Sequence, residues 1–149
     1  MKVFLDTNIL LDLLLEREGY EASAQIFQLR DEGKIALCVS ILTMVNVAFV
    51  YKKSVGQHAV IPNLKYLSDL VEVLPMANDT LQQALYLNGK DFEDILQYVC
   101  AAENHCDVVV TRNTKDFHIA RGLKDPPPAI PVLAPDEFLA SFPGVGKII

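Results

Sequence analysis

The chain has 149 residues, a length that suits one domain built around one hydrophobic core. Although 51% of the residues are hydrophobic, no apolar run approaches the roughly 18 uninterrupted residues that a membrane helix needs, which argues against a membrane-spanning class. The formal net charge of -6 argues against broad electrostatic adhesion to nucleic acid, which comes largely from Lys and Arg, but it does not exclude a nuclease whose carboxylates hold a divalent cation.

The chain opens with the stretch MKVFLDTNILLDLLL, in which a short apolar strand, Lys2–Leu5, gives way to a helix, Asn8–Leu15. Asp6 therefore stands at the carboxyl end of the strand, and in α/β proteins ligands bind at that edge of the sheet. Asp6, Asn8 and Asp12 interrupt the apolar run, and no small-residue cleavage site follows it. We therefore expect a fold element here rather than a signal peptide.

Strands and helices continue to alternate along the chain. The stretch 20–34 has the apolar spacing of a helix that ends near Gly33. A buried strand is expected at Ile35–Val39, and Ser40 is suited to N-cap the helix that follows at 41–53. The remaining predicted elements, in chain order, are a helix at His58–Leu70, a strand at 71–75, a helix at 79–88 capped by Asn78 and stopped by Gly89, a helix at 91–105, a strand at Asp107–Thr111, a strand at 130–135 and a helix at 136–142.

This alternation predicts an α/β fold, a parallel sheet covered by helices on both faces. We expect one domain, residues 1–149, because the chain has no internal repeat and no low-complexity tract. Cys38, Cys100 and Cys106 have neither a metal-ligand spacing nor the even number of a disulfide framework. Free thiols suit a reducing cytosol, which predicts a cytoplasmic location.

Acidic side chains occur at the ends of several of these elements. Asp6 follows the first strand, Asp91 and Asp94 open a helix, and Asp116 follows the strand Asp107–Thr111. A parallel sheet brings such positions together, and carboxylate oxygens are the ligands that hard cations such as Mg²⁺ and Mn²⁺ prefer. Because four carboxylates in one pocket repel one another, their convergence predicts a metal ion.

Each acidic position taken singly also has a simpler explanation. Asp91 is suited to cap the helix that it opens, Asp94 lies in the first turn, where the helix dipole favours an anion, and Asp116 is suited to cap a short helix. Asp6 is harder to explain in this way. A carboxylate at the end of a buried strand is costly to desolvate unless a cation or a set of donors meets it.

A polar stripe runs along the predicted helix 41–53, because Ser40, Thr43 and Asn46 recur every three residues. Such a stripe faces either a polar pocket or hydrogen-bonding partners in the core. The pocket is preferred, since Ser40 begins the helix at the same edge of the sheet as Asp6.

Three motifs, FLDTNILLD, DFEDILQYVCA and TRNTKDF, occur in this order over a chain of this length. Together they resemble the PIN domain, and most closely the compact bacterial form that is the toxin of VapBC-type toxin–antitoxin pairs. The resemblance covers essentially the whole chain. It implies a three-layer α/β/α sandwich around a central parallel sheet and an Mg²⁺- or Mn²⁺-dependent ribonuclease.

The resemblance also implies roles for single residues. By motif, Asp6 would be the first acidic metal ligand, Asp94 the third and Asp116 the fourth, with Asp91 accompanying Asp94. The residues expected to support this site are Thr7, Asn8, Ser40, Asn46, Thr111 and Asn113.

One position departs from the family pattern. The second acidic ligand is usually a Glu on the helix after the second strand, and this position is Asn46 here. An amide oxygen is able to ligate a metal directly or through water, but it brings no negative charge and cannot serve as a base. We therefore expect a lower metal affinity, and a two-metal arrangement is not favoured.

Basic residues are candidates for contacts with the RNA backbone, although each also suits an ordinary solvated surface. These residues are Lys52, Lys53, Arg112, Lys115 and Arg121. A toxin of this kind implies an antitoxin protein that docks over the acidic pocket. Exposed apolar surface on helices such as IFQL, residues 26–29, suits a homodimer, and no membrane partner is expected.

Two other functions remain open from the sequence. The first is a PIN-fold module that binds RNA or protein without cleavage, because Asn46 replaces the usual Glu; a gain of metal affinity in Asn46→Glu would show that the pocket persists. The second is a phosphate-handling α/β hydrolase with Asp6 as nucleophile. The stretch DTN lacks the second aspartate that haloacid-dehalogenase-like phosphatases place two residues on.

Overall fold

The computed structural model describes residues 1–117 and 129–142. Arg121, one of the predicted RNA contacts, lies outside these residues. Of Asp116 only the backbone is described.

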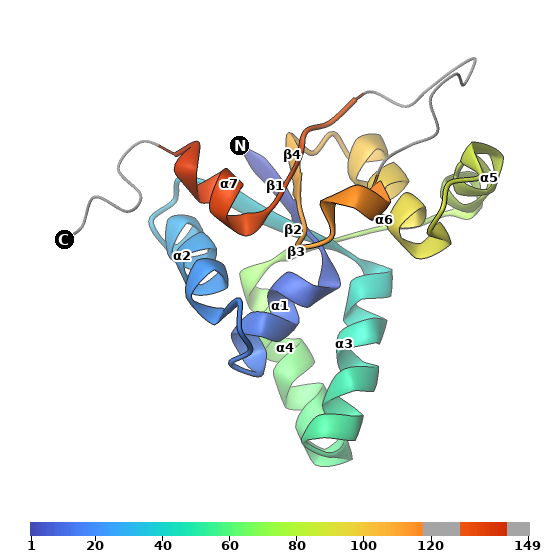
Figure 1. The fold of residues 1–149 in the computed structure, drawn as a ribbon. Coiled ribbons are helices and arrows are strands. Elements are labelled where there is room, and N and C mark those ends of the chain that lie inside the picture. Colours follow the sequence, from blue (N-terminus) through green and yellow to red (C-terminus); the bar gives the residue numbers. More distant parts are fainter. Residues whose placement is uncertain (118–128, 143–149) are drawn as a thin grey trace.

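A five-stranded parallel sheet forms the centre of the protein (Figure 1). The strands are β1 (Lys2–Leu5), β2 (Ala36–Ser40), β3 (Glu72–Leu74), β4 (Val108–Val110) and β5 (Val132–Leu133). Their order in the sheet is β3-β2-β1-β4-β5, so the chain proceeds in one direction from β1 to β3 and in the other from β4 to β5. Such a reversal next to β1 creates a crevice at the carboxyl ends of β1 and β4, where α/β proteins bind ligands.

Alternating side chains of each strand face opposite helical layers, because the side-chain period of a strand is two. Val3 and Leu5 pack in a core with five helices, whereas Phe4 packs on the other face against residues of α6. The five helices of the first layer are α1 (Thr7–Leu14), α2 (Tyr20–Asp31), α3 (Ile41–Ser54), α4 (Val60–Leu70) and α7 (Pro135–Ala140). The second layer holds α6 (Phe92–Glu103), with α5 (Asn78–Leu87) packed on it. The predicted three-layer α/β/α sandwich is confirmed.

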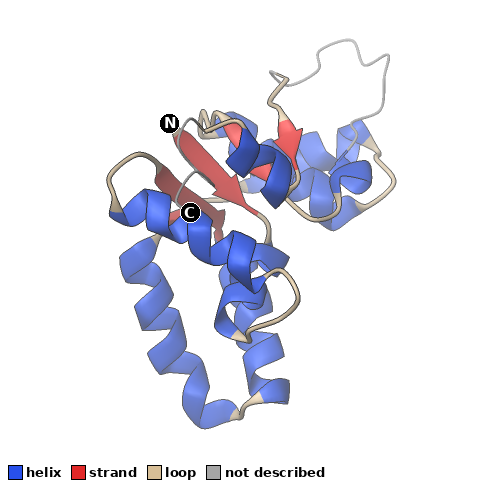
Figure 2. Ribbon diagram, turned by 60° about the vertical axis from the view of Figure 1, so that its left-hand side comes forward, coloured by secondary structure: helices blue, strands red, loops and turns tan. Residues whose placement is uncertain are grey.

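The helices α3 and α4 form a long hairpin that extends away from the sheet (Figure 2). A short 3-10 helix, η1 (Gln57–Ala59), joins them at the tip. Ser40 N-caps α3 as predicted, since its side chain accepts a hydrogen bond from the Thr43 backbone N–H at 3.1 Å. The first turn of α3 is thereby fixed at the carboxyl edge of the sheet.

The predicted boundaries of α5 are wrong at both ends. Asn78 is the first helical residue rather than the cap, and the Ala77 backbone N–H donates to the Thr80 hydroxyl at 3.1 Å. Asn88, and not Gly89, takes the left-handed conformation that ends the helix, with φ 47. Asn tolerates this conformation better than most residues. Gly89 has a packing role instead, because a Cβ there would collide with Ile95.

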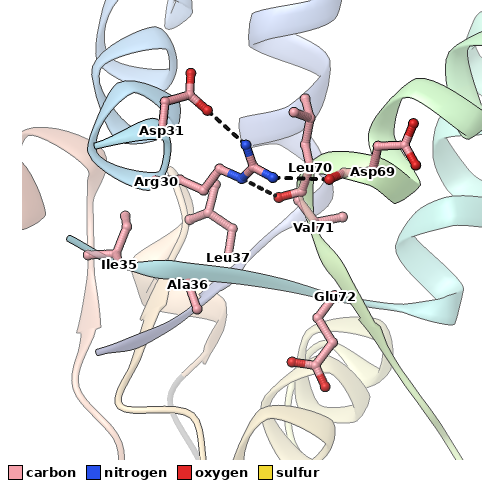
Figure 3. Close-up of a pocket in the computed structure, with 9 residues that line it drawn as sticks. All are labelled: Arg30, Asp31, Ile35, Ala36, Leu37, Asp69, Leu70, Val71 and Glu72. Atoms are coloured by element: carbon pink, nitrogen blue, oxygen red, sulfur yellow. Dashed lines mark hydrogen bonds and ion pairs between the residues drawn. The ribbon is translucent and has the colours of Figure 1, made fainter. Parts of the chain in front are cut away.

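The apolar residues of the IFQL stretch on α2 are not exposed, which corrects the expected dimer surface. Ile26, Phe27 and Leu29 are all buried in the core. The next residue, Arg30, ties α2 to the end of α4: its Nε donates to the Leu70 carbonyl and its Nη2 to the Asp69 carbonyl, each at 3.0 Å (Figure 3). This face of α2 therefore holds the fold together and offers no apolar surface to a second chain.

All three cysteines are buried free thiols, as their number and spacing predicted. None of the helices in residues 1–117 and 129–142 is long and apolar enough to span a membrane.

Candidate active site

A pocket lies at the carboxyl edge of β1, among residues of α1, α3, α6 and the segment that follows β4. The residues that line it are Asp6, Thr7, Asn8, Leu11, Asn46, Phe49, Val50, Asp91, Glu93, Asp94 and Asn113. Four of these side chains are carboxylates, and no lining residue from the described part of the chain is Lys or Arg. The described part of the pocket wall therefore concentrates negative charge without a cationic side chain.

Asp6 is held rigidly at the base of this pocket. It is only 5% exposed, and it N-caps α1 through Oδ1, which accepts the Thr7 backbone N–H at 2.8 Å. Its Oδ2 accepts the Thr111 hydroxyl at 2.9 Å. Burial raises the pKa of this carboxyl, and the two hydrogen bonds act in the opposite direction. The charge of Glu93 raises the pKa further, whereas the more weakly acting charge of Arg112 lowers it. Neutral donors thus fix the direction of Asp6 without cancelling its charge.

Thr111 also organises the segment after β4. Its Oγ1 accepts the Asn113 backbone N–H at 3.0 Å, and Asn113 lines the pocket. The chain then enters the short 3-10 helix η2 (Thr114–Phe117), which contains the backbone of Asp116. Phe117 is buried against α6, so its packing anchors the end of η2 beside the pocket.

The polar stripe of α3 divides between the core and the pocket, so the prediction that it faces the pocket holds for one residue. Ser40 donates to Gln97 Oε1 at 2.6 Å, and Gln97 Nε2 donates to the Thr43 hydroxyl at 2.9 Å. The Thr43 and Thr7 hydroxyls lie 3.1 Å apart. This buried network joins α1, α3 and α6 beneath the pocket, and only Asn46 of the stripe lines the pocket itself.

Gln97 was not recognised in the sequence. It lies on α6 three residues after Asp94, a spacing that places both side chains on one face of the helix. A fully buried glutamine must satisfy its amide, and the polar stripe of α3 provides the partners. The three-residue spacing between Asp94 and Gln97 was the feature of the sequence that could have indicated a role for Gln97.

The amino end of α6 brings three acidic side chains to the pocket. Asp91 is the N-cap, as the simpler explanation expected, and its Oδ1 accepts the Asp94 backbone N–H at 3.1 Å. Asp94 and Asp91 both line the pocket. Glu93 lines it too, and its Oε1 accepts the Asn46 side-chain amide at 2.7 Å. Glu93 lies within the DFED stretch, whose motif assigns roles to Asp91 and Asp94 only.

The predicted RNA contacts differ in their surroundings. Lys52, Lys53 and Lys115 are exposed, and the Lys53 Nζ lies 4.5 Å from the ring centroid of Phe49, a residue of the pocket wall. Arg112 instead has an internal partner, because its Nε lies 3.0 Å from Oδ2 of the fully buried Asp12. The position of Arg112 is therefore explained by an ion pair within the fold.

The donor set of the pocket fits a hard divalent cation. Carboxylate and amide oxygens line it, with no thiol or imidazole among the described lining residues. Within the described residues, no three His, Cys, Asp or Glu side chains form a group that would hold a metal ion; the Asp116 side chain is not part of that set. The charge and chemistry of the described wall suit a divalent cation.

Comparison with known proteins finds a matching family model and a protein of similar sequence. A family model described as the PIN domain matches residues 2–115. The chain is 29% identical over 143 residues to Ribonuclease VapC1 of Aquifex aeolicus (strain VF5), covering 92% of each chain.

Solved structures match the fold. VapBC2 from Rickettsia felis, bound to a DNA fragment from their promoter, contains a chain that aligns with a TM-score of 0.64 at 16% identity, over 90% of this chain and 98% of that one. DNA-bound VapBC from Salmonella typhimurium gives a TM-score of 0.64 at 19% identity, over 91% and 98% of the two chains.

Proposed function

This chain belongs to the PIN domain family, and on that premise we propose that it is a metal-dependent endoribonuclease, the toxin of a toxin–antitoxin pair. The observation that carries the proposal is the pocket at the reversal of strand order, which four carboxylates line without a Lys or Arg among the described lining residues. The likeness to a ribonuclease over 92% of both chains supports the reaction class.

The metal ligands in this proposal are Asp6, Asp94 and Asp116, and the ion is Mg²⁺ or Mn²⁺. When bound, such a cation lowers the pKa of a water molecule and neutralises charge on the attacked phosphate. Asp6 contributes a carboxylate whose direction is fixed by Thr7 and Thr111. Asp91 or Asp94 orients the attacking water, and hydrolysis leaves 5′-phosphate and 3′-hydroxyl ends. Thr7, Thr111 and the network beneath them keep the wall in place during this step.

RNA would approach along the pocket mouth, with exposed lysines on its backbone. Lys53 lies against Phe49 at the pocket wall, and Lys115 lies on η2, which follows the pocket residue Asn113 in the chain. Lys52 and Arg121 complete the set of proposed phosphate contacts. Such contacts position the strand and carry no sequence information.

A toxin of this class is restrained by a partner, so the proposal includes an antitoxin protein. Two solved structures of similar fold, from Rickettsia felis and Salmonella typhimurium, are VapBC proteins, which supports this partner. A homodimer and a cytoplasmic location are also part of the proposal. The single domain at 1–149 belongs to it as well, because the sheet and both helical layers draw on residues from Lys2 to Ala140.

The direct test is cleavage of an end-labelled structured RNA by the purified protein with Mg²⁺, with Mn²⁺ and with EDTA. Cleavage is expected with either ion, none with EDTA, and none with Asp6→Asn, whose folding is checked by circular dichroism. Cleavage that persists in EDTA, or in the folded Asp6→Asn variant, would refute the proposed metal site.

The alternative is a module that binds RNA or protein without cutting. Asn46 in place of the usual Glu is the observation that favours it. A folded protein that binds RNA but cleaves none of a broad RNA pool with either ion would establish this alternative.

A further inference from the structure

The missing acid of α3 has a counterpart on α6. Asn46 stands where the family usually has a Glu, and its amide Nδ2 donates to Glu93 Oε1 at 2.7 Å. Both side chains line the pocket. The pair therefore carries one negative charge at this part of the wall, located on α6 instead of α3.

We propose that Glu93 supplies the acidic ligand for the divalent cation that the family usually takes from α3, and that Asn46 is a positioning residue that holds the Glu93 carboxylate at the pocket. This inference rests on the proposed function, because it concerns the same cation.

The chemistry of the contact supports this division of roles. An amide N–H₂ group is a donor, so Asn46 fixes a carboxylate that accepts from it. A Glu at position 46 would set two carboxylates against each other at hydrogen-bonding distance, and like charges so close are unfavourable. Asn at 46 is thus the residue type that fits Glu at 93.

Glu93 is also close enough to act on the other proposed ligand. Its negative charge acts on Asp6, which is buried at the base of the pocket. Its hydrogen-bond partner is the neutral Asn46 amide, so its charge is not cancelled by that contact. Glu93 and Asp6 approach the pocket from α6 and β1, which is the arrangement that a shared cation stabilises.

A simpler role for Glu93 is a favourable interaction with the dipole of α6, since it lies in the first turn. The chain provides a matched control for this role. Glu21 is the second residue of α2 as Glu93 is of α6, both helices have 12 residues, and both side chains are exposed. Glu21 is not among the residues that line the pocket.

The experiment measures Mn²⁺ binding to the full chain by electron paramagnetic resonance of the free ion, with no RNA present. Glu93→Gln is expected to weaken binding by about tenfold or more, as loss of a ligand or of its immediate support does. Glu21→Gln is expected to bind like the wild type. The double variant Asn46→Glu/Glu93→Gln exchanges acid and amide while keeping a hydrogen bond, and it is expected to recover most of the lost affinity.

Equal Mn²⁺ affinity in Glu93→Gln and Glu21→Gln would overturn the inference, and so would a folded double variant that binds no better than Glu93→Gln. Asp6→Asn in the same assay separates this failure from failure of the proposed function. If Asp6→Asn weakens Mn²⁺ binding and the wild type cleaves RNA, only the role of Glu93 is lost. If the wild type neither binds Mn²⁺ nor cleaves RNA, both proposals are wrong.

Discussion

Asp6 and Asp12 are two buried carboxylates at the two ends of α1, and they differ in the groups that surround their charges. Asp6 is 5% exposed and receives hydrogen bonds from the Thr7 N–H and the Thr111 hydroxyl. Asp12 is 0% exposed and pairs with Arg112, which comes from the segment after β4. Burial raises the pKa of both carboxyls.

The two carboxylates differ in whether their charge is available to a ligand. The Arg112 guanidinium faces the Asp12 carboxylate inside the fold, so Asp12 links α1 to the segment after β4, and its complete burial closes it to a ligand. Neutral donors orient Asp6 and leave its charge to the pocket. A buried carboxylate held by neutral donors is thus a candidate ligand, whereas one paired with Arg is a structural contact.

The largest effect expected from this contrast is on RNA cleavage. Asp6→Asn should lower kcat/KM by about a thousandfold, because the metal contribution to such a reaction is several kcal/mol. Asp12→Asn should change kcat/KM by about threefold or less, because it removes no group from the pocket. Initial rates on one RNA at equal folded fractions measure both. A loss in Asp12→Asn as large as that in Asp6→Asn would abolish the distinction.

A smaller effect is expected on stability. Arg112→Ala should lower the free energy of unfolding by about 2 kcal/mol, because it leaves the Asp12 carboxylate buried without its cation. This loss is smaller than that expected for a fully buried ion pair, because the Arg112 side chain is 40% exposed. Urea unfolding measures this change, and adding Asp12→Asn to the variant should recover part of it. Weaker RNA binding with unchanged stability would instead return Arg112 to the RNA contacts.

The smallest effect is a difference in pH dependence between wild type and Asp12→Asn. The pKa of Asp12 is raised in the folded state above its ordinary value of 3.8, mainly by burial. Between the unfolded and folded pKa values the native state binds more protons, so the free energy of unfolding falls as pH rises through that window. Asp12→Asn lacks this component, and its stability relative to wild type should increase over the same window in EDTA. Parallel curves would show that the Asp12 pKa is not raised.

Much of this architecture was readable from the order of residues. The short apolar strand at Lys2–Leu5, the cap at Ser40 and the cap at Asp91 all depend on local propensity and local hydrogen bonds, and the structure has them as predicted. The alternation of strands and helices sufficed for a parallel sheet, because parallel strands need crossover connections.

Local rules failed where a distant contact decided the outcome. The IFQL stretch on α2 was expected to be exposed, but the sheet and α7 pack against that helix and bury it. Gly89 was expected to stop α5, and its lack of a side chain instead makes room for Ile95 of α6.

The sequence by itself determined that acidic residues follow β1, open α6 and follow β4, because each lies at the end of an element with its own local signal. Only the tertiary structure decided which side chains lie next to them. It paired Arg112 with Asp12, joined Ser40 and Thr43 to Gln97, and set Glu93 against Asn46. These pairs depend on which helices a parallel sheet brings together, and hydrogen bonds between residues so far apart in the chain leave no periodic trace in the sequence.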